Sequence, residues 1–215
     1  MDRQPDIALN TLDTDWFGAP APCRPRWALC VHGGGLCFRA GADMPPVCLE
    51  TDGGGGFIEG LWEGDAAELF LLNPATGFYV EFNLSPKGSW WCCPFDAPRA
   101  RAAPSPAPLP GARTETTANE AGWDSAITVP LASLPAALAF DPGTTKGNIT
   151  FCLGRPPRHF TLADLGGGAP DFHRPHKWVP LKQLLVASCQ LPVRCCGPKA
   201  ASEFTSNWRL VTGGR

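Results

Sequence analysis

Two carboxylates stand on neighbouring stretches of alternating residues between positions 60 and 86. The period-2 pattern predicts one strand over residues 66–72, a turn at residues 73–76, and a return strand over residues 77–84. With that turn, Glu68 on the first strand falls directly opposite Glu81 on the second. Like charges that face each other across a strand pair repel. We therefore expect a cation, the hydroxyls of a ligand or solvent to offset the pair.

The face that carries the two carboxylates also carries rings and an amide. Trp62, in a glycine-flanked segment just before the hairpin, is expected to be exposed. Surfaces that mix hydrogen-bonding groups with aromatic rings bind polar ligands that have flat, C–H-rich faces, and sugars fit that description. The members of the predicted face are Glu68, Phe70, Tyr79, Glu81 and Asn83.

Paired carboxylates are also the catalytic groups of glycosidases, one acting as acid and the other as base or nucleophile. Side chains on a flat sheet face do not form the deep, water-excluding cleft that this chemistry needs. His32 begins a His-Gly-Gly-Gly run like that of lipase oxyanion holes, but the sequence has no G-x-S-x-G motif. The residues therefore argue against an enzyme.

The opposite face of the predicted hairpin is apolar and should be buried between two sheets. Leu69, Leu71, Val80 and Phe82 lie on it. The predicted turn would pair Leu71 with Phe78 and Leu69 with Val80.

Composition favours a β protein. Glycine and proline contribute 24 residues each to the 215, which leaves little room for helices. Further strands are expected in a hairpin over residues 25–40 and at residues 123–131, 147–154 and 178–187, with a single helical turn within residues 134–140. Short strands without a βαβ rhythm predict an all-β, antiparallel β-sandwich of jelly-roll or immunoglobulin-like two-sheet architecture.

We expect one folded domain over residues 25–187, preceded by a polar lead at residues 1–24 and followed by a tail at residues 188–215 to which the sequence assigns no structure. Within the domain, residues 97–112 are rich in proline and alanine and should form a loop.

Charge and hydropathy exclude several classes of partner. The formal net charge is −2 and no basic run occurs, which argues against nucleic acid or an anionic membrane surface. No apolar run approaches the ~18 residues that a membrane span requires. The first residues lack the apolar core of a secretory signal, so a cytoplasmic location is expected.

The ten cysteines have irregular spacings and form no CxxC pair, so we expect free thiols and no zinc site. A hairpin that turns at residues 32–35 would set Cys30 opposite Cys37, within reach of air oxidation, although two small hydrophobic side chains on a strand are the simpler interpretation.

A set of motifs in a fixed order resembles the family 9 carbohydrate-binding modules and the wider DOMON-like sandwiches. The set begins with Trp62-Glu-Gly-Asp-Ala-Ala-Glu68 and its hairpin, continues with Gly122-Trp123 through Pro130 and with Gly147-Asn-Ile149, and closes with residues 171–178, DFHRPHKW. The resemblance extends from about residue 27 to residue 185, as scattered motifs.

The resemblance implies a non-catalytic site that holds a terminal sugar between two rings. Trp62 matches the first ring and Glu68 the acceptor carboxylate. Phe172 stands where the second ring, usually tryptophan, would be, and Asn83 stands where a characterised member has an arginine. Phenylalanine is a smaller stacking surface and asparagine lacks the cationic fork. The slot is therefore either retuned to another ligand or no longer binds sugar, in which case a protein-interaction module is the alternative.

The resemblance also suggests two cofactors, calcium and haem. Family members often carry structural calcium, for which Asp65 is the candidate ligand, although one aspartate is weak evidence. Some DOMON sandwiches hold haem between their sheets, and Met44 with a histidine would be the axial pair here. No other residue supports haem, and we expect no cofactor.

Overall fold

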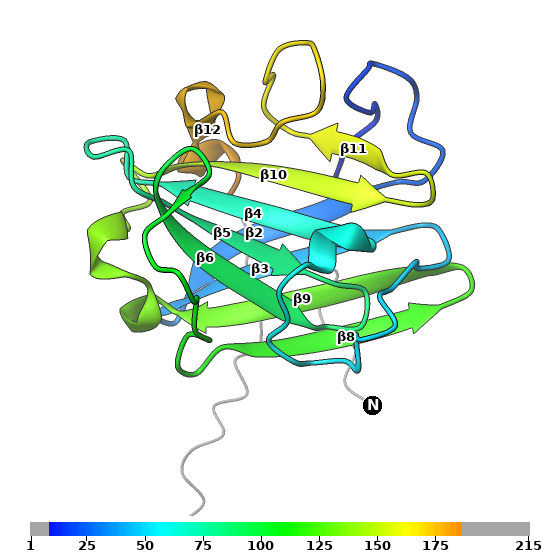
Figure 1. Cartoon of the computed structure of the whole chain (residues 1–215), viewed down its shortest axis with the longest axis horizontal. Coiled ribbons are helices and arrows are strands. Elements are labelled where there is room, and N and C mark those ends of the chain that lie inside the picture. Colours follow the sequence, from blue (N-terminus) through cyan, green and yellow to red (C-terminus); the bar gives the residue numbers. More distant parts are fainter. Residues whose placement is uncertain (1–8, 186–215) are drawn as a thin grey trace, which may run out of the picture.

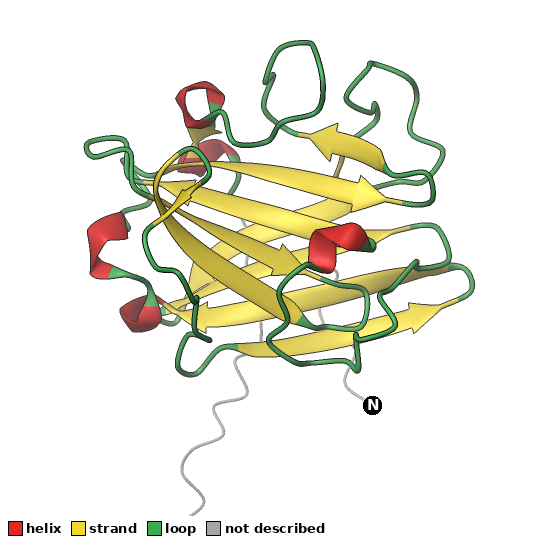
Figure 2. Ribbon diagram, in the orientation of Figure 1, coloured by secondary structure: helices red, strands yellow, loops and turns green. Residues whose placement is uncertain are grey.

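Two antiparallel sheets lie face to face in the computed structural model, which describes residues 9–185 (Figures 1 and 2). Helix is limited to five short 3-10 turns in this part of the chain, and none of its helices is long and apolar enough to cross a membrane. The protein is therefore an all-β sandwich, as the sequence predicts.

The first sheet has five strands in the order β1-β2-β3-β9-β8. Their bounds are β1 Asn10–Thr11, β2 Arg26–His32, β3 Gly35–Ala42, β9 Gly122–Pro130 and β8 Arg113–Asn119.

The second sheet has the order β11-β10-β4-β5-β6-β7, with β12 paired to β10 beside this path. Their bounds are β11 Arg158–Thr161, β10 Lys146–Leu153, β4 Ala66–Leu72, β5 Tyr79–Leu84, β6 Trp90–Ala97, β7 Ala100–Arg101 and β12 Val179–Pro180.

The main core fills the space between the sheets. The four apolar residues that the alternation assigned to it, Leu69, Leu71, Val80 and Phe82, are all buried there, which confirms that prediction. The five-stranded sheet contributes large side chains to the same cluster, among them Trp27, Phe38 and Trp123.

The outer face of the seven-stranded sheet is buried as well. Every residue of β4 and of β5 is buried, on both faces. A second apolar cluster covers the outer face, and loop residues such as Leu165 and Trp178 complete it. Trp90 and Trp91 on β6 divide between the two clusters, as neighbours on a strand must.

The predicted register of the β4–β5 hairpin is wrong by two residues. Leu71 pairs with Val80, Leu69 with Phe82, and Glu68 with Asn83 rather than with Glu81. The cause is a loop of the predicted length that lies one residue later in the chain. The Asn73 amide donates to the Phe78 carbonyl at 2.8 Å. Asn73 and Phe78 are therefore the last paired residues, and residues 74–77 between them form the loop.

A shift of two residues leaves every side chain on its predicted face. Glu68 and Glu81 therefore still share the outer face, but as diagonal neighbours, because Phe70 is the residue opposite Glu81.

Most other predicted strands are present. The β2–β3 hairpin sets Cys30 opposite Cys37, as predicted, and Cys37 keeps a free thiol. β9 buries Trp123, Ser125, Ile127 and Val129, the face that its alternation predicted. The expected helical turn is η3, Ala136–Leu138.

The expected strand over residues 178–187 is wrong. It is reduced to the two residues of β12, after which Leu181–Gln183 form the 3-10 turn η5, and residues 186 and 187 lie outside the described part. Pro180 has no amide to donate to a ladder. Leu181 and Leu184, three apart, both reach the core, and this spacing suits a helical turn better than a strand.

Part of the polar lead belongs to the sandwich. β1 pairs with β2, and Leu12 and Cys23 are buried in the main core. Arg158 on β11 donates to Asp15 at 2.6 Å. Within the described residues the free thiols are Cys23, Cys37, Cys48, Cys92, Cys93 and Cys152.

Substitution of Gly147 on β10 tests how closely β10 approaches β4. A Cβ at this position would lie 2.5 Å from the Phe70 carbonyl oxygen, which belongs to the backbone of β4 and cannot move alone. Gly147→Ala should therefore lower the free energy of unfolding by about 1–3 kcal/mol, measured by urea denaturation. Gly53→Ala is the matched control, because nothing lies within 4 Å of its added Cβ. Equal effects of the two substitutions would contradict this account of the β4–β10 contact.

Candidate functional site

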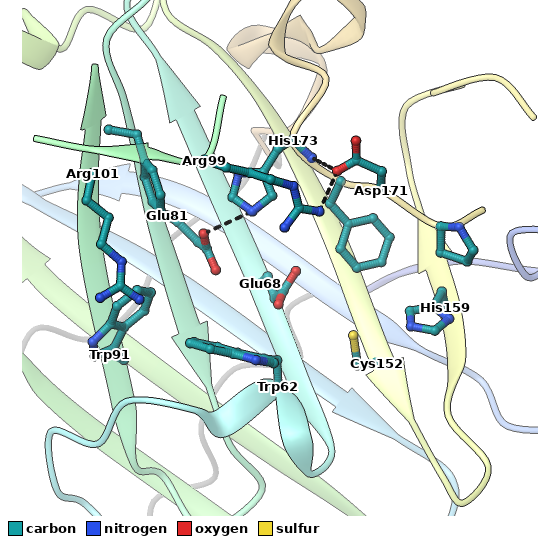
Figure 3. Close-up of a pocket in the computed structure, with 13 residues that line it drawn as sticks. Trp62, Glu68, Glu81, Trp91, Arg99, Arg101, Cys152, His159, Asp171 and His173 are labelled. Carbon is teal, nitrogen blue, oxygen red and sulfur yellow. Dashed lines mark hydrogen bonds and ion pairs between the residues drawn. The ribbon is translucent and has the colours of Figure 1, made fainter. Parts of the chain in front are cut away.

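A cavity of about 350 Å³ opens on the outer face of the seven-stranded sheet (Figure 3). Its volume lies at the lower end of the range for small-molecule sites. The residues that line it are Trp62, Glu68, Glu81, Trp91, Phe95, Arg99, Arg101, Cys152, His159, Pro170, Asp171, Phe172 and His173.

Two carboxylates lie in the lining, one from the middle of β4 and one from β5. Glu68 and Glu81 are only 4% and 5% exposed. Each has one oxygen held by a neighbour on the sheet. Thr150 Oγ1 donates to Glu68 Oε2 at 2.7 Å, and Asn83 Nδ2 donates to Glu81 Oε1 at 2.8 Å. Figure 3 shows both carboxylates between Trp62 and His173.

Burial makes both carboxyl groups weak acids. Desolvation, and next the charge of Glu81, raise the pKa of Glu68 to about 8. Desolvation likewise raises the pKa of Glu81 to about 7. Near neutral pH the pair therefore retains protons that ordinary carboxylates would have lost.

Aromatic rings form the walls. Trp62, in the 3-10 turn η1 (Leu61–Glu63), is 36% exposed and meets Trp91 edge to face, with ring centroids 5.3 Å apart. Phe172 lines the cavity from the loop after β11 and contacts the rings of Trp16 and His159, each at 5.9 Å.

Two arginines lie at the rim, Arg99 in the turn between β6 and β7 and Arg101 on β7, and both are paired. Arg99 Nη2 donates to Asp171 Oδ1 at 2.7 Å. Arg101 forms an ion pair with Glu59 and places its guanidinium over the Trp91 ring. The rim cations are thus matched by rim carboxylates.

His173 lies beside Glu81 as a neutral ring. Tyr79 Oη accepts a hydrogen bond from the Arg99 amide at 3.1 Å and forms a second hydrogen bond with His173 Nδ1 at 2.7 Å. His173 Nε2 faces Glu81 Oε2 at 3.6 Å. Desolvation, and next the charge of Arg99, lower the pKa of His173 to about 4, so the ring is no counter-ion for Glu81 at neutral pH.

Of the residues that the sequence proposed as ligand contacts, Trp62, Glu68, Glu81 and Phe172 come together in the cavity lining. Tyr79 and Asn83 lie on the same face but are fully buried and outside the lining. They contact residues of the lining instead: Tyr79 forms a hydrogen bond with His173, and Asn83 donates one to Glu81.

Asp65, the candidate calcium ligand, ties two loops together. Its oxygens accept hydrogen bonds from the amides of Val47 at 2.9 Å and Gly154 at 2.7 Å. Among the residues that the structure describes, no cluster of three or more histidine, cysteine, aspartate or glutamate side chains is arranged to hold a metal ion.

The sequence reasoning missed much of the lining, above all Arg99, Arg101 and Trp91 as cavity residues. The two arginines are the only charged residues within residues 97–112, and that isolation in a proline- and alanine-rich loop was the available signal. Asp171 adjoins Phe172 in the closing motif, so its place beside the cavity follows from the same match.

No protein-family model and no curated protein sequence matches this chain. Among solved structures, a protein from Bacteroides uniformis, to which carbohydrate binding has been assigned provisionally, matches with a TM-score of 0.61 and 17% identity, over 80% of this chain and 84% of that chain. The two chains share the same sandwich fold.

Two structures of a family 9 carbohydrate-binding module from Caldicellulosiruptor kristjanssonii, one with glucose and one with cellotriose, match with TM-scores of 0.48 and 13% identity. The matches cover 82% and 84% of this chain and 81% and 80% of those chains.

The buried carboxyl groups should make stability depend on pH. A carboxyl whose pKa is higher in the folded than in the unfolded protein stabilises the fold at low pH, and this contribution is lost as the pH rises through the folded pKa. For Glu68 and Glu81 the loss extends to about pH 7–8. His173, with a lowered pKa, has the opposite effect, but only below its ordinary value of 6.5.

Between pH 6.5 and 8 the free energy of unfolding should therefore fall by about 1–2 kcal/mol. In Glu68→Gln, which keeps the side-chain shape, that fall should be reduced. Urea denaturation at several pH values measures both slopes. Glu120→Gln, at an exposed turn position, is the control and should retain the wild-type slope. Parallel curves for Glu68→Gln and the wild type would contradict the assignment of the buried charge.

Proposed function

We propose that this protein is a non-catalytic carbohydrate-binding domain that holds a terminal sugar in the cavity. Trp62 and Phe172 would contact the C–H faces of the ring, and Glu68 and Glu81 would accept hydrogen bonds from its hydroxyls. The observation that carries the proposal is the cavity itself, which combines an exposed tryptophan, a second ring and two buried carboxylates with spare acceptor capacity.

The partial exposure of Trp62 supports a role as a stacking surface. Nearly all other large apolar side chains in the described residues are buried or half-buried, and Phe17 is the other large exposed one. Of these two, Trp62 lines the cavity. An indole face in a partly enclosed pocket gains dispersion and desolvation energy when a flat ligand covers it.

The carboxylates provide the polar half of the recognition. Glu68 and Glu81 each use one oxygen for a sheet neighbour, so each retains acceptor capacity toward the cavity. Hydrogen bonds to charged groups contribute about 1.5–3 kcal/mol each. After the entropy of association is subtracted, we expect affinities in the micromolar to millimolar range.

The fold agrees with the proposal but does not carry it. The Bacteroides uniformis protein of the same fold has a provisional carbohydrate-binding assignment, at 17% identity. The functional inference for this chain therefore rests on its own residues and on the motif resemblance, with Phe172 in place of the usual tryptophan. Asn83 donates a hydrogen bond to Glu81, and the arginines near the cavity are Arg99 in the β6–β7 turn and Arg101 on β7.

The electrostatics disfavour glycoside hydrolysis. A glycosidase separates the pKa values of its two carboxyl groups, so that one stays ionised while the other holds a proton. Here desolvation raises the pKa of both Glu68 and Glu81. Two weakly acidic carboxyl groups with no cation from the described residues beside them are suited to hydrogen bonding rather than to acting as a separate acid and base.

The haem alternative gains no support from the packing. Its pocket would lie between the sheets, where the side chains of the main core pack against one another. Met44 packs against that core, whereas His159 and His173 line the cavity on the outer face of the sheet.

Trp62→Ala tests the proposal. Loss of the stacking surface should weaken sugar binding at least tenfold, since one ring contact and its buried area are worth more than 1.4 kcal/mol. A glycan array identifies a bound sugar, and isothermal titration of that sugar measures the ratio of affinities. Because the indole is partly exposed and contacts Trp91 by its edge, the stability cost should be about 1–2 kcal/mol, with the fold retained.

Phe17→Ala is the matched control, because Phe17 is 76% exposed and does not line the cavity. It should leave the affinity unchanged. Full affinity in a folded Trp62→Ala protein, or an array on which the wild type binds no sugar, would overturn the proposed function and favour the protein-interaction alternative.

A further inference from the structure

Resting on the proposed function, we propose that the cavity selects sugars that carry a protonated amine, whose ammonium group would lie between Glu68 and Glu81. The ligand class is an amino sugar in its cationic form. The proposal derives from the charges that line the cavity and from the atoms that remain without partners.

The two carboxylates have no cationic partner within the described residues. Glu68 forms no ion pair there, and it accepts a hydrogen bond from the Thr150 hydroxyl. Glu81 is held by the Asn83 amide and faces the neutral ring of His173. Buried carboxylates are normally paired with a cation, so two together without one mark a place where a cation belongs.

The rim arginines do not fill this place. Arg99 is committed to Asp171, and Arg101 to Glu59. Arg99 lowers the pKa of both carboxyl groups and Arg101 lowers that of Glu81, but these effects are smaller than that of desolvation. The remaining titratable groups of the lining are His159, His173 and Cys152, and burial favours the neutral form of each.

The free acceptor atoms suit an ammonium group. Glu68 Oε2 and Glu81 Oε1 are occupied. Within the described residues this leaves Glu68 Oε1 and Glu81 Oε2 as acceptors without a hydrogen bond, the second of them facing His173 Nε2 at 3.6 Å. An ammonium group has three donors and no acceptor, so it can bond both oxygens at once. A hydroxyl has one hydrogen to donate and can satisfy only one of the two.

Charge also ranks the competing sugars. A neutral sugar leaves the repulsion between the two carboxylates in place. An acidic sugar adds a further negative charge next to them, and the arginines that would attract it are already paired. A cationic sugar removes the repulsion. The raised pKa values imply that the cation would displace a proton from the pair.

The experiment compares D-glucosamine with D-glucose, which carries a hydroxyl at the position of the amine. Isothermal titration at pH 6.5, where the amine is protonated, should give at least about tenfold tighter binding of glucosamine, because charge-assisted hydrogen bonds are roughly twice as strong as neutral ones. Titrations in phosphate and in MES should also show that glucosamine binding releases between one and two protons, because the pair holds that many at this pH, and that glucose binding releases none.

Glu81→Gln removes one of the two charges and should bring the glucosamine-to-glucose affinity ratio close to one, with the fold checked by circular dichroism. Glu120→Gln removes the same charge from an exposed turn and should keep the wild-type ratio. A second cationic probe, D-galactosamine, should follow glucosamine in both variants.

The outcomes separate this inference from the proposed function. If glucose and glucosamine bind equally, or if the array detects only neutral or acidic sugars, the amine preference is wrong and the proposed function stands. If the wild type binds no sugar at all, both fail. A preference that survives in Glu81→Gln would also overturn the inference, since the charge would then lie elsewhere.

Discussion

The central strands β4 and β5 of the seven-stranded sheet are buried on both faces, and the arrangement of the site follows from this constraint. All residues of β4 and β5 are buried, although their outer face contains two glutamates, an asparagine and a tyrosine. Burial without hydrogen bonds is costly for polar groups, so each of these side chains forms at least one hydrogen bond within the protein, although Asn83 Oδ1 has none. Thr150 donates a hydrogen bond to Glu68, and Asn83 donates one to Glu81. Tyr79 forms hydrogen bonds with both the Arg99 amide and His173. The cavity lies where this cover is incomplete.

The segments that cover the outer face are also the segments that form the cavity rim. The loop after β11 is fixed by Asn148, whose Oδ1 accepts from the Ala163 amide, and by Trp178, whose Nε1 donates to the Phe172 carbonyl. The second of these bonds fixes the backbone from which the Phe172 ring projects. The β6–β7 turn is joined to the same loop by the Arg99–Asp171 ion pair. Rings and charges of the site are therefore held by the contacts that close the second apolar cluster.

The period-2 pattern was enough to predict the sandwich and the division of faces, because apolar alternation reports directly which side meets the core. It could not predict the register, since a shift of two residues leaves all faces unchanged. Strand β8 escaped prediction for another reason. Its sequence RTETTAN has no apolar alternation, and as an exposed edge strand it needs none. Arg99 and Arg101 reach the cavity through the fold of a proline-rich loop, which no local pattern encodes.

The register that the sequence did not predict is the one that makes the site possible. Directly opposed side chains on antiparallel strands have Cβ atoms roughly 5 Å apart, whereas diagonal neighbours are about 7–8 Å apart. Direct opposition of Glu68 and Glu81 would force two buried carboxylates into contact, which is tolerable only if they share a proton. The loop lies at residues 74–77, one residue later than predicted, and this places Glu68 opposite Asn83 instead. Asn83 then holds Glu81 from the side, and the wider diagonal spacing leaves room between the carboxylates for a group from a ligand.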